Sequence, residues 1–133
     1  MNQILGRYSE QIYAVMRLVV GFLFACHGAS KLFGWFSNTP GQTPPLFSLT
    51  GLAGVIEFFG GLLIAVGWFA SYAAFLASGT MAVAYFMSHY PQGFWPIKNR
   101  GELAAVYSFV FLFIAAKGSG RWSVDAALRR SRH

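Results

Sequence analysis

Four ionisable side chains lie within long apolar stretches of this 133-residue sequence. Arg17, His27 and Lys31 belong to the first stretch, and Glu57 belongs to the second. At 100° per residue of helix, the first three fall within an arc of about 80° and therefore share one face. A carboxylate in an apolar environment either binds a proton or finds a cation. We therefore expect Glu57 to pair with His27 or Lys31, and alternatively with Arg17.

A second polar group lies near the start of the last apolar stretch. Residues 103–116 would form about 21 Å of helix, whereas the hydrocarbon of a bilayer is about 30 Å thick. The helix is therefore expected to begin near Asn99 and to draw Glu102 below the membrane surface. Together with the first group, these residues predict one polar pocket in the outer leaflet, with Tyr107 on its floor. The expected ligand-binding residues are His27, Lys31, Glu57, Asn99, Glu102 and Tyr107.

This pocket has two interpretations. A structural ion-pair network would hold the helices together without performing chemistry. A ligand or proton-handling site would use the same residues, since a histidine beside two carboxylates can exchange protons near neutral pH. Its candidate catalytic groups are Glu57, His27 and Glu102. We expect no metal site, because His27 and His89 lack a metal-ligand spacing such as His-x-x-x-His.

The elements that must position these residues are four apolar stretches, at about residues 12–33, 46–68, 69–88 and 99–117. The chain is 56% hydrophobic and only 11% charged. A membrane-spanning helix needs about 20 apolar residues, and helices satisfy their own backbone polar groups. The sequence predicts an all-α fold, a membrane four-helix bundle formed by one transmembrane domain, residues 1–133. Arg17 and Lys31 lie near opposite ends of the first span, where a long side chain can reach water.

The formal charge of +6 is concentrated beside the predicted spans. Basic residues next to membrane spans mark the cytoplasmic side and attract anionic lipid headgroups. We therefore expect both the N- and C-termini in the cytoplasm, with the lipid bilayer as a partner. Nucleic acid is not expected as a partner, because no soluble module displays this charge. The residues concerned are Arg7, Lys117, Arg121, Arg129, Arg130 and Arg132.

Small residues recur along the predicted spans at intervals of about one helical turn. Such ridges let membrane helices approach closely, where no hydrophobic effect drives them together. The expected helix-packing residues are Gly21, Ala25, Gly60, Gly61, Ala74 and Ser78.

Four motifs in order resemble the DoxX family of small bacterial four-helix membrane proteins. They are an early arginine followed by His27-Gly28-x-x-Lys31, Gly54-x-x-Glu57-x-x-Gly60-Gly61 with Gly67 beyond it, Asn99-x-Gly101-Glu102, and Gly118-x-Gly120-x-x-Ser123-x-Asp125. The resemblance covers nearly the whole chain and implies a multi-pass protein of the bacterial inner membrane. It nominates the histidine, lysine, asparagine and two glutamates of the predicted pocket. It also implies an association with redox complexes, since related proteins include a subunit of a thiosulfate:quinone oxidoreductase.

The first functional hypothesis is a membrane subunit of a redox-associated complex that offers a pocket to a quinone or small polar ligand. His27, Lys31 and Tyr107 would donate hydrogen bonds, the two glutamates would relay protons, and an apolar slot would hold the tail. The slot residues would be Phe24, Phe58 and Phe59. If the protein takes part in catalysis, it would be an accessory subunit of a quinone-linked oxidoreductase, because the sequence has no cofactor motif of its own. The alternative is a non-catalytic structural or assembly subunit. Both hypotheses imply other membrane or redox subunits as partners.

Overall fold

A computed structural model of the chain describes residues 4–34 and 47–131, and within these ranges every regular element is a helix. The all-helical prediction is confirmed. Residue 46 of the second expected span and Arg132 of the basic tail lie outside the described residues. The helices are α1 (Ser9–Phe33), α2 (Leu49–Val66), α3 (Ala70–Ala84), α4 (Pro96–Asn99), α5 (Glu102–Lys117) and α6 (Val124–Ser131). A π-helical turn, Tyr85–His89, continues α3.

Three helical segments of the described chain are long and apolar enough to cross a membrane: Gly6–Phe33, Leu49–Val66 and Ala70–Gln92. α5 has 16 residues and measures about 24 Å, which is less than the hydrocarbon thickness of about 30 Å. The fourth span and the four-helix membrane bundle stay predictions. The expected start of this helix near Asn99 is wrong. Arg100 adopts a left-handed conformation (φ 61°) that ends α4, so α5 begins afresh at Glu102.

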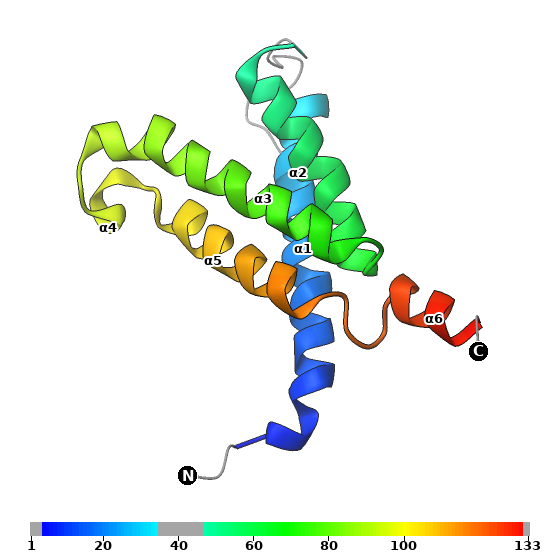
Figure 1. Cartoon of the computed structure of the whole chain (residues 1–133). Helices are drawn as coiled ribbons and strands as arrows, with labels where there is room; N and C mark the ends of the chain where they lie inside the picture. Colours follow the sequence, from blue (N-terminus) through cyan, green and yellow to red (C-terminus); the bar gives the residue numbers. More distant parts are fainter. Residues whose placement is uncertain (1–3, 35–46, 132–133) are drawn as a thin grey trace.

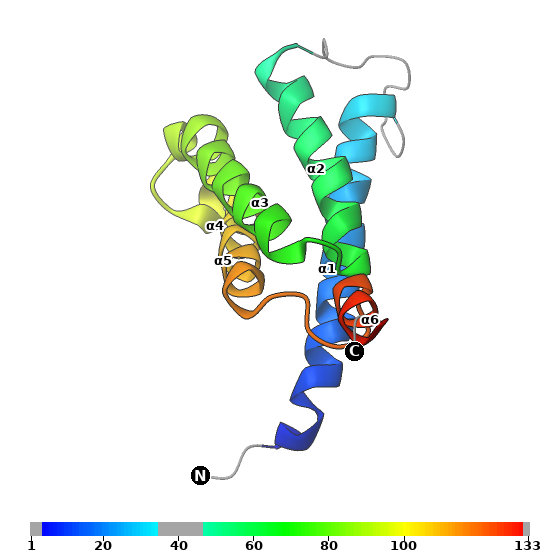
Figure 2. The same ribbon diagram turned by 45° about the vertical axis from the view of Figure 1, so that its right-hand side comes forward.

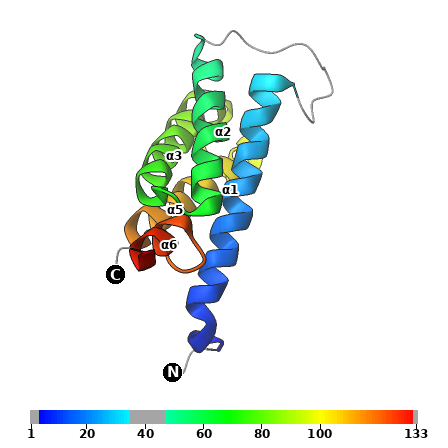
Figure 3. The ribbon, with the colours of Figure 1, turned by 90° about the vertical axis from the view of Figure 1, so that its right-hand side faces the viewer.

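The long helices form two antiparallel pairs, α1 with α2 and α3 with α5 (Figure 1). The pairs cross at a steep angle, and α2 and α3 diverge from the short turn that joins them (Figure 2). The start of α1, the α2–α3 turn and α6 lie toward one end, which we call the terminal end (Figure 3). The last turn of α1, the first turn of α2 and the π-helical turn lie toward the other, which we call the distal end.

Glycines bring α1 and α2 into backbone contact. A Cβ on Gly21 would lie 2.5 Å from the Ala65 nitrogen, and one on Gly61 would lie 2.5 Å from the Ala25 nitrogen. Such a distance is far below any van der Waals contact, so these two glycines permit the close packing of the pair. Gly60 differs, because a Cβ there would meet open space.

The α2–α3 turn is fixed by Gly67. Gly67 is left-handed (φ 75°), and its N–H donates to the Ile64 carbonyl while the Trp68 N–H donates to the Leu63 carbonyl. These two bonds form a Schellman motif, in which a left-handed residue ends the helix and satisfies its last carbonyls. At the other end of α2, the Ser48 hydroxyl accepts a bond from the Gly51 N–H.

An aromatic and alanine-rich core joins the two helix pairs. The ring of Phe24 on α1 lies 4.6 Å from that of Phe111 on α5, and Tyr107 stacks on Phe111 at 5.4 Å. Between α3 and α5 the buried Ser78 hydroxyl donates to the Ser108 carbonyl at 2.7 Å, while Ala74 beside it is fully buried. Small and polar side chains therefore hold the second pair together, as glycines do the first.

Candidate functional site

An ion pair between α1 and α2 is the polar feature of the distal half of the molecule. Lys31 Nζ lies 2.8 Å from Glu57 Oε1. The Lys31 side chain is 34% exposed and that of Glu57 only 3% exposed. The second carboxylate oxygen of Glu57, Oε2, is buried and has no hydrogen-bond partner among the described residues. Of the three cations considered for Glu57 from sequence, the structure selects Lys31.

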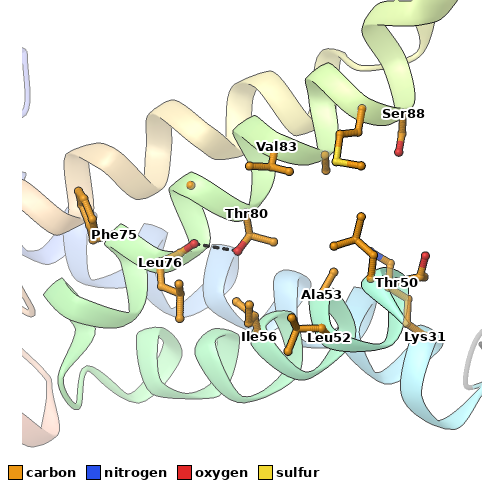
Figure 4. Close-up of a pocket in the computed structure, with 14 residues that line it drawn as sticks. Lys31, Thr50, Leu52, Ala53, Ile56, Phe75, Leu76, Thr80, Val83 and Ser88 are labelled. Atoms are coloured by element: carbon orange, nitrogen blue, oxygen red, sulfur yellow. Dashed lines mark hydrogen bonds between the residues drawn. The ribbon is translucent and has the colours of Figure 1, made fainter. Parts of the chain in front are cut away.

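Lys31 also lies at the end of a groove between α2 and α3 (Figure 4). The groove has a volume of about 530 Å³ and opens where the two helices diverge. Its wall from α2 includes Thr50, Ala53 and Ile56, and its wall from α3 includes Leu76, Gly79, Thr80 and Val83. The ammonium group carries three donors, of which Glu57 takes one. The remaining donors are available to an oxygen acceptor at this end of the groove.

Two contacts join residues that were predicted for one pocket, Lys31 with Glu57 and His27 with Tyr107. No hydrogen bond or ion pair among the described residues joins Asn99 or Glu102 to these four. His27 is exposed on α1, and its ring packs edge-on against Tyr107 with centroids 6.1 Å apart. Tyr107 is buried in the aromatic core, where it stacks on Phe111. Glu102 is exposed at the first residue of α5 and makes no ion pair among the described residues. Because α5 starts at Glu102, the helix lacks the preceding turn that was expected to carry this side chain below the membrane surface.

Asn99 is fully buried but serves the loop before α5. Its side-chain amide donates to the Gly93 carbonyl at 2.9 Å, and its oxygen accepts from the Gly101 N–H at 2.8 Å. The Asn99 carbonyl bonds His89 Nδ1 at 3.1 Å. With these bonds the asparagine is satisfied locally, and it does not face Glu57. Of the residues expected to form the apolar slot, Phe24 is completely buried in the core, whereas Phe58 and Phe59 pack edge-on against each other with centroids 5.1 Å apart.

A second polar cluster, at the terminal end, is built around Arg17. This side chain is only 1% exposed and does not extend to water as expected. Its Nη1 donates to the carbonyls of Ile64 (3.1 Å) and Ala65 (2.9 Å), and its Nη2 to those of Trp122 (2.9 Å) and Arg121 (3.4 Å). These carbonyls belong to the end of α2 and to the segment before α6. A cation at the C-terminal end of a helix also complements the helix dipole.

Asp125 completes the terminal cluster. Its carboxylate accepts from the Phe69 N–H at the start of α3 (3.0 Å) and from the Ser119 hydroxyl (2.6 Å). Its own N–H donates to the Gly67 carbonyl at 3.0 Å. A side chain on Gly67 would collide with Ser123 and would come within 2.8 Å of Arg17 Nη1. Gly67 therefore both adopts the backbone conformation of the turn and leaves room for the Arg17 guanidinium.

Sequence reasoning missed the two features that matter most here. The groove between α2 and α3 had no polar signal, although the unobstructed Gly79 of α3 contributes to it. The roles of Ser119 and Asp125 were also missed, although both belong to the segment after the last span whose glycines, Ser123 and Asp125 form a motif. Ser123 does cap α6, as its position before that helix suggests, by accepting from the Ala126 N–H at 3.1 Å.

Comparison with known proteins identifies the family of the chain. Residues 12–90 match the model of the DoxX family. The chain is also 38% identical over 125 residues to a protein of Haemophilus influenzae described as an uncharacterized protein, covering 91% of this chain and 93% of that one. No solved structure matches the chain significantly. The apolar helices and these matches make the chain a membrane protein, and it belongs to the DoxX family.

Proposed function

We propose that the protein binds a lipid-soluble ligand with an oxygen-bearing head, such as a quinone, in the groove between α2 and α3. In this proposal it acts as the integral membrane subunit of a redox-associated complex. The observation that carries the proposal is the position of Lys31, which lines the end of an apolar groove and is paired with a buried carboxylate.

The groove matches the two parts of such a ligand. Aliphatic and small side chains along α2 and α3 suit an isoprenoid or alkyl tail, and ligand sites of this kind are mostly apolar with few polar groups. Lys31 supplies a donor for a carbonyl oxygen of the head. Glu57 Oε2 is an unused acceptor beside it, which gives a place to hold a proton next to the ligand.

This arrangement changes the assignment made from sequence. The head contacts Lys31 and not Glu102, which lies at the exposed start of α5. The tail follows Ile56, Leu76 and Val83 in place of the phenylalanines first considered. Glu57 keeps its role as the proton-holding group.

The experiment fills the groove with a side chain and leaves the Lys31–Glu57 ion pair unchanged. Gly79→Leu places a side chain into the groove, whereas Gly60→Leu adds the same atoms at another helical glycine whose Cβ would meet open space, outside the groove. Each protein is reconstituted in phosphatidylcholine nanodiscs, and decylubiquinone binding is measured by equilibrium titration. We expect Gly79→Leu to weaken binding at least tenfold and Gly60→Leu to leave it unchanged, a difference of about 1.4 kcal/mol or more. Equal binding by both variants would place the ligand elsewhere.

A structural or assembly subunit is the second candidate. The favouring observation is that Glu57 is 2% exposed and joins two adjacent helices, which suits a staple inside a membrane. A chain with Glu57→Gln would then still support its partner complex in full. Recovery of the complex from native membranes, compared between the wild type and this variant, separates the two functions.

The orientation proposed for the protein follows from its charges. We propose four spans, α1, α2, α3 and α5, in a bacterial inner membrane with both termini in the cytoplasm. The terminal end contains Arg7, Arg121, Arg129 and Arg130, as the positive-inside rule requires for a cytoplasmic face. A reporter fused after Arg130 should be active in the cytoplasm, and a tag inserted at residues 38–43 should be accessible from outside. The reverse pattern would overturn the orientation.

A further inference from the structure

A cationic cleft lies at the terminal end, away from the groove between α2 and α3. It has a volume of about 720 Å³ and is lined by Arg121, Trp122, Ala126, Arg129 and Arg130. No carboxylate lines it. The two acidic residues described at this end are engaged elsewhere, Glu10 with Lys117 at 2.9 Å and Asp125 with Ser119. The cleft therefore presents three guanidinium groups without a counter-charge from its own lining.

An apolar hollow of about 510 Å³ adjoins this cleft along α1. Its walls are Ile12, Val15, Met16 and Val19, with Gln11 at one end. Trp122 lines both the hollow and the cationic cleft. The cationic cleft and the apolar hollow thus meet at the exposed indole ring of Trp122.

The backbone that carries this arrangement is held from inside the protein. Trp122 is left-handed (φ 55°), and its carbonyl accepts the 2.9 Å bond from Arg17. The amide of Gln11, when oriented to satisfy its neighbours, accepts a bond from Arg121 Nη1 at 3.3 Å. The backbone of Trp122 and the guanidinium of Arg121 are therefore held against α1 by these hydrogen bonds.

We propose that the cleft and the hollow together bind one anionic phospholipid. The phosphate would lie against the three arginines, whose guanidinium groups suit phosphate oxygens. One acyl chain would follow the apolar face of α1, and the indole of Trp122 would lie at the headgroup level, where tryptophan is favoured. A soluble phosphate would use the cleft but has no reason to need the hollow. The site is separate from the quinone groove and does not depend on it.

The headgroup is tested by a charge-matched pair of variants. Arg129→Gln/Arg130→Gln removes two cations from the cleft, and Arg7→Gln/Lys98→Gln removes two exposed cations outside it. Binding of dioleoylphosphatidylglycerol and dioleoylphosphatidylcholine to the purified protein is compared by native mass spectrometry. Each basic residue near a membrane surface contributes about 1 kcal/mol, a factor of about five. The first variant should lose phosphatidylglycerol binding by about 25-fold, while the second and the wild type stay alike. Equal losses in both variants, or no preference for phosphatidylglycerol in the wild type, would overturn the proposal.

The acyl chain is tested by filling the hollow. Val15→Phe narrows it, and Leu18→Phe adds a ring to an exposed position of α1 outside it. Val15→Phe should weaken phosphatidylglycerol binding by at least fivefold, with Leu18→Phe unchanged. Inorganic phosphate at millimolar concentration should fail to displace the lipid. Displacement by inorganic phosphate, or equal binding by the two phenylalanine variants, would show a site for the phosphate group alone and would contradict the lipid assignment.

Discussion

Arg17 and Lys31 lie on one face of α1, yet their surroundings differ in kind. Arg17 is enclosed by four backbone carbonyls from two segments, and no carboxylate of the described residues lies within hydrogen-bond distance of it. Lys31 has one carboxylate, Glu57, and an opening toward a groove. An arginine cannot give up its proton, whereas a lysine–glutamate pair can. The first cluster therefore fixes the fold, and the second keeps the means to bind a ligand or move a proton.

The largest effect expected is that of Arg17→Met. Four carbonyls would lose a donor in a buried place, and each buried unsatisfied group costs about 1–3 kcal/mol before relaxation. We expect a loss of about 3–5 kcal/mol in the free energy of unfolding, measured by denaturant titration in mixed micelles. Arg17→Lys should recover only part of the loss, because an ammonium group cannot span both segments. Full stability of Arg17→Lys would show that only charge matters there.

The Lys31–Glu57 pair should contribute less and should show coupling. Lys31→Met leaves a buried carboxylate without its cation, and we expect a loss of about 2–3 kcal/mol, reduced by the partial exposure of the lysine. The double variant Lys31→Met/Glu57→Gln should be more stable than the sum of the single losses allows, by about 1–2 kcal/mol. Unfolding free energies of the four proteins give this coupling directly. Strictly additive losses would mean that the pair contributes nothing as a pair.

Asp125 tests whether the terminal cluster extends beyond Arg17. Asp125→Ala removes the acceptor for the Phe69 N–H and for Ser119. We expect the loss of these two hydrogen bonds to lower the free energy of unfolding by about 1–2 kcal/mol. Ser119→Ala, which removes only one of the two bonds, should cost less. Thermal unfolding of both variants in detergent provides the measurement. If Ser119→Ala were the more damaging change, the carboxylate would not be the organising group.

Glu102 should give the smallest effect on stability. It is exposed at the start of α5, so Glu102→Gln should change the free energy of unfolding by about 0.5 kcal/mol or less. The same variant should bind decylubiquinone as the wild type does. Weakened binding would show that Glu102 contributes to the ligand site. It would contradict the assignment of that site to the groove, away from the start of α5.

The parts of this structure that the sequence predicted are those with a local or periodic signal. Apolar runs marked the long helices, and the spacing of cations against Glu57 left Lys31 among its candidate partners. The surroundings of Arg17 gave no such signal. Every residue has a backbone carbonyl, and the sequence does not indicate which carbonyls will accept a hydrogen bond from a buried cation. The separation of Asn99 and Glu102 from the pocket depended on one left-handed residue, Arg100. The length of the last apolar stretch alone had predicted a helix that begins near Asn99 and brings both residues into the pocket.

The hydrogen bonds of Arg17 also bear on the synthesis and membrane insertion of the protein. Two of its acceptors follow it by fewer than 50 residues, but the other two come 104 and 105 residues later in the chain. During synthesis Arg17 would therefore enter the bilayer before two of its four acceptors, the carbonyls of Arg121 and Trp122, have been made. A product cut short before residue 121 would keep a buried cation half satisfied, which is a defect that membrane proteases and chaperones can detect. The arginine thus makes the segment that contains Arg121 and Trp122 a condition for the stability of the fold.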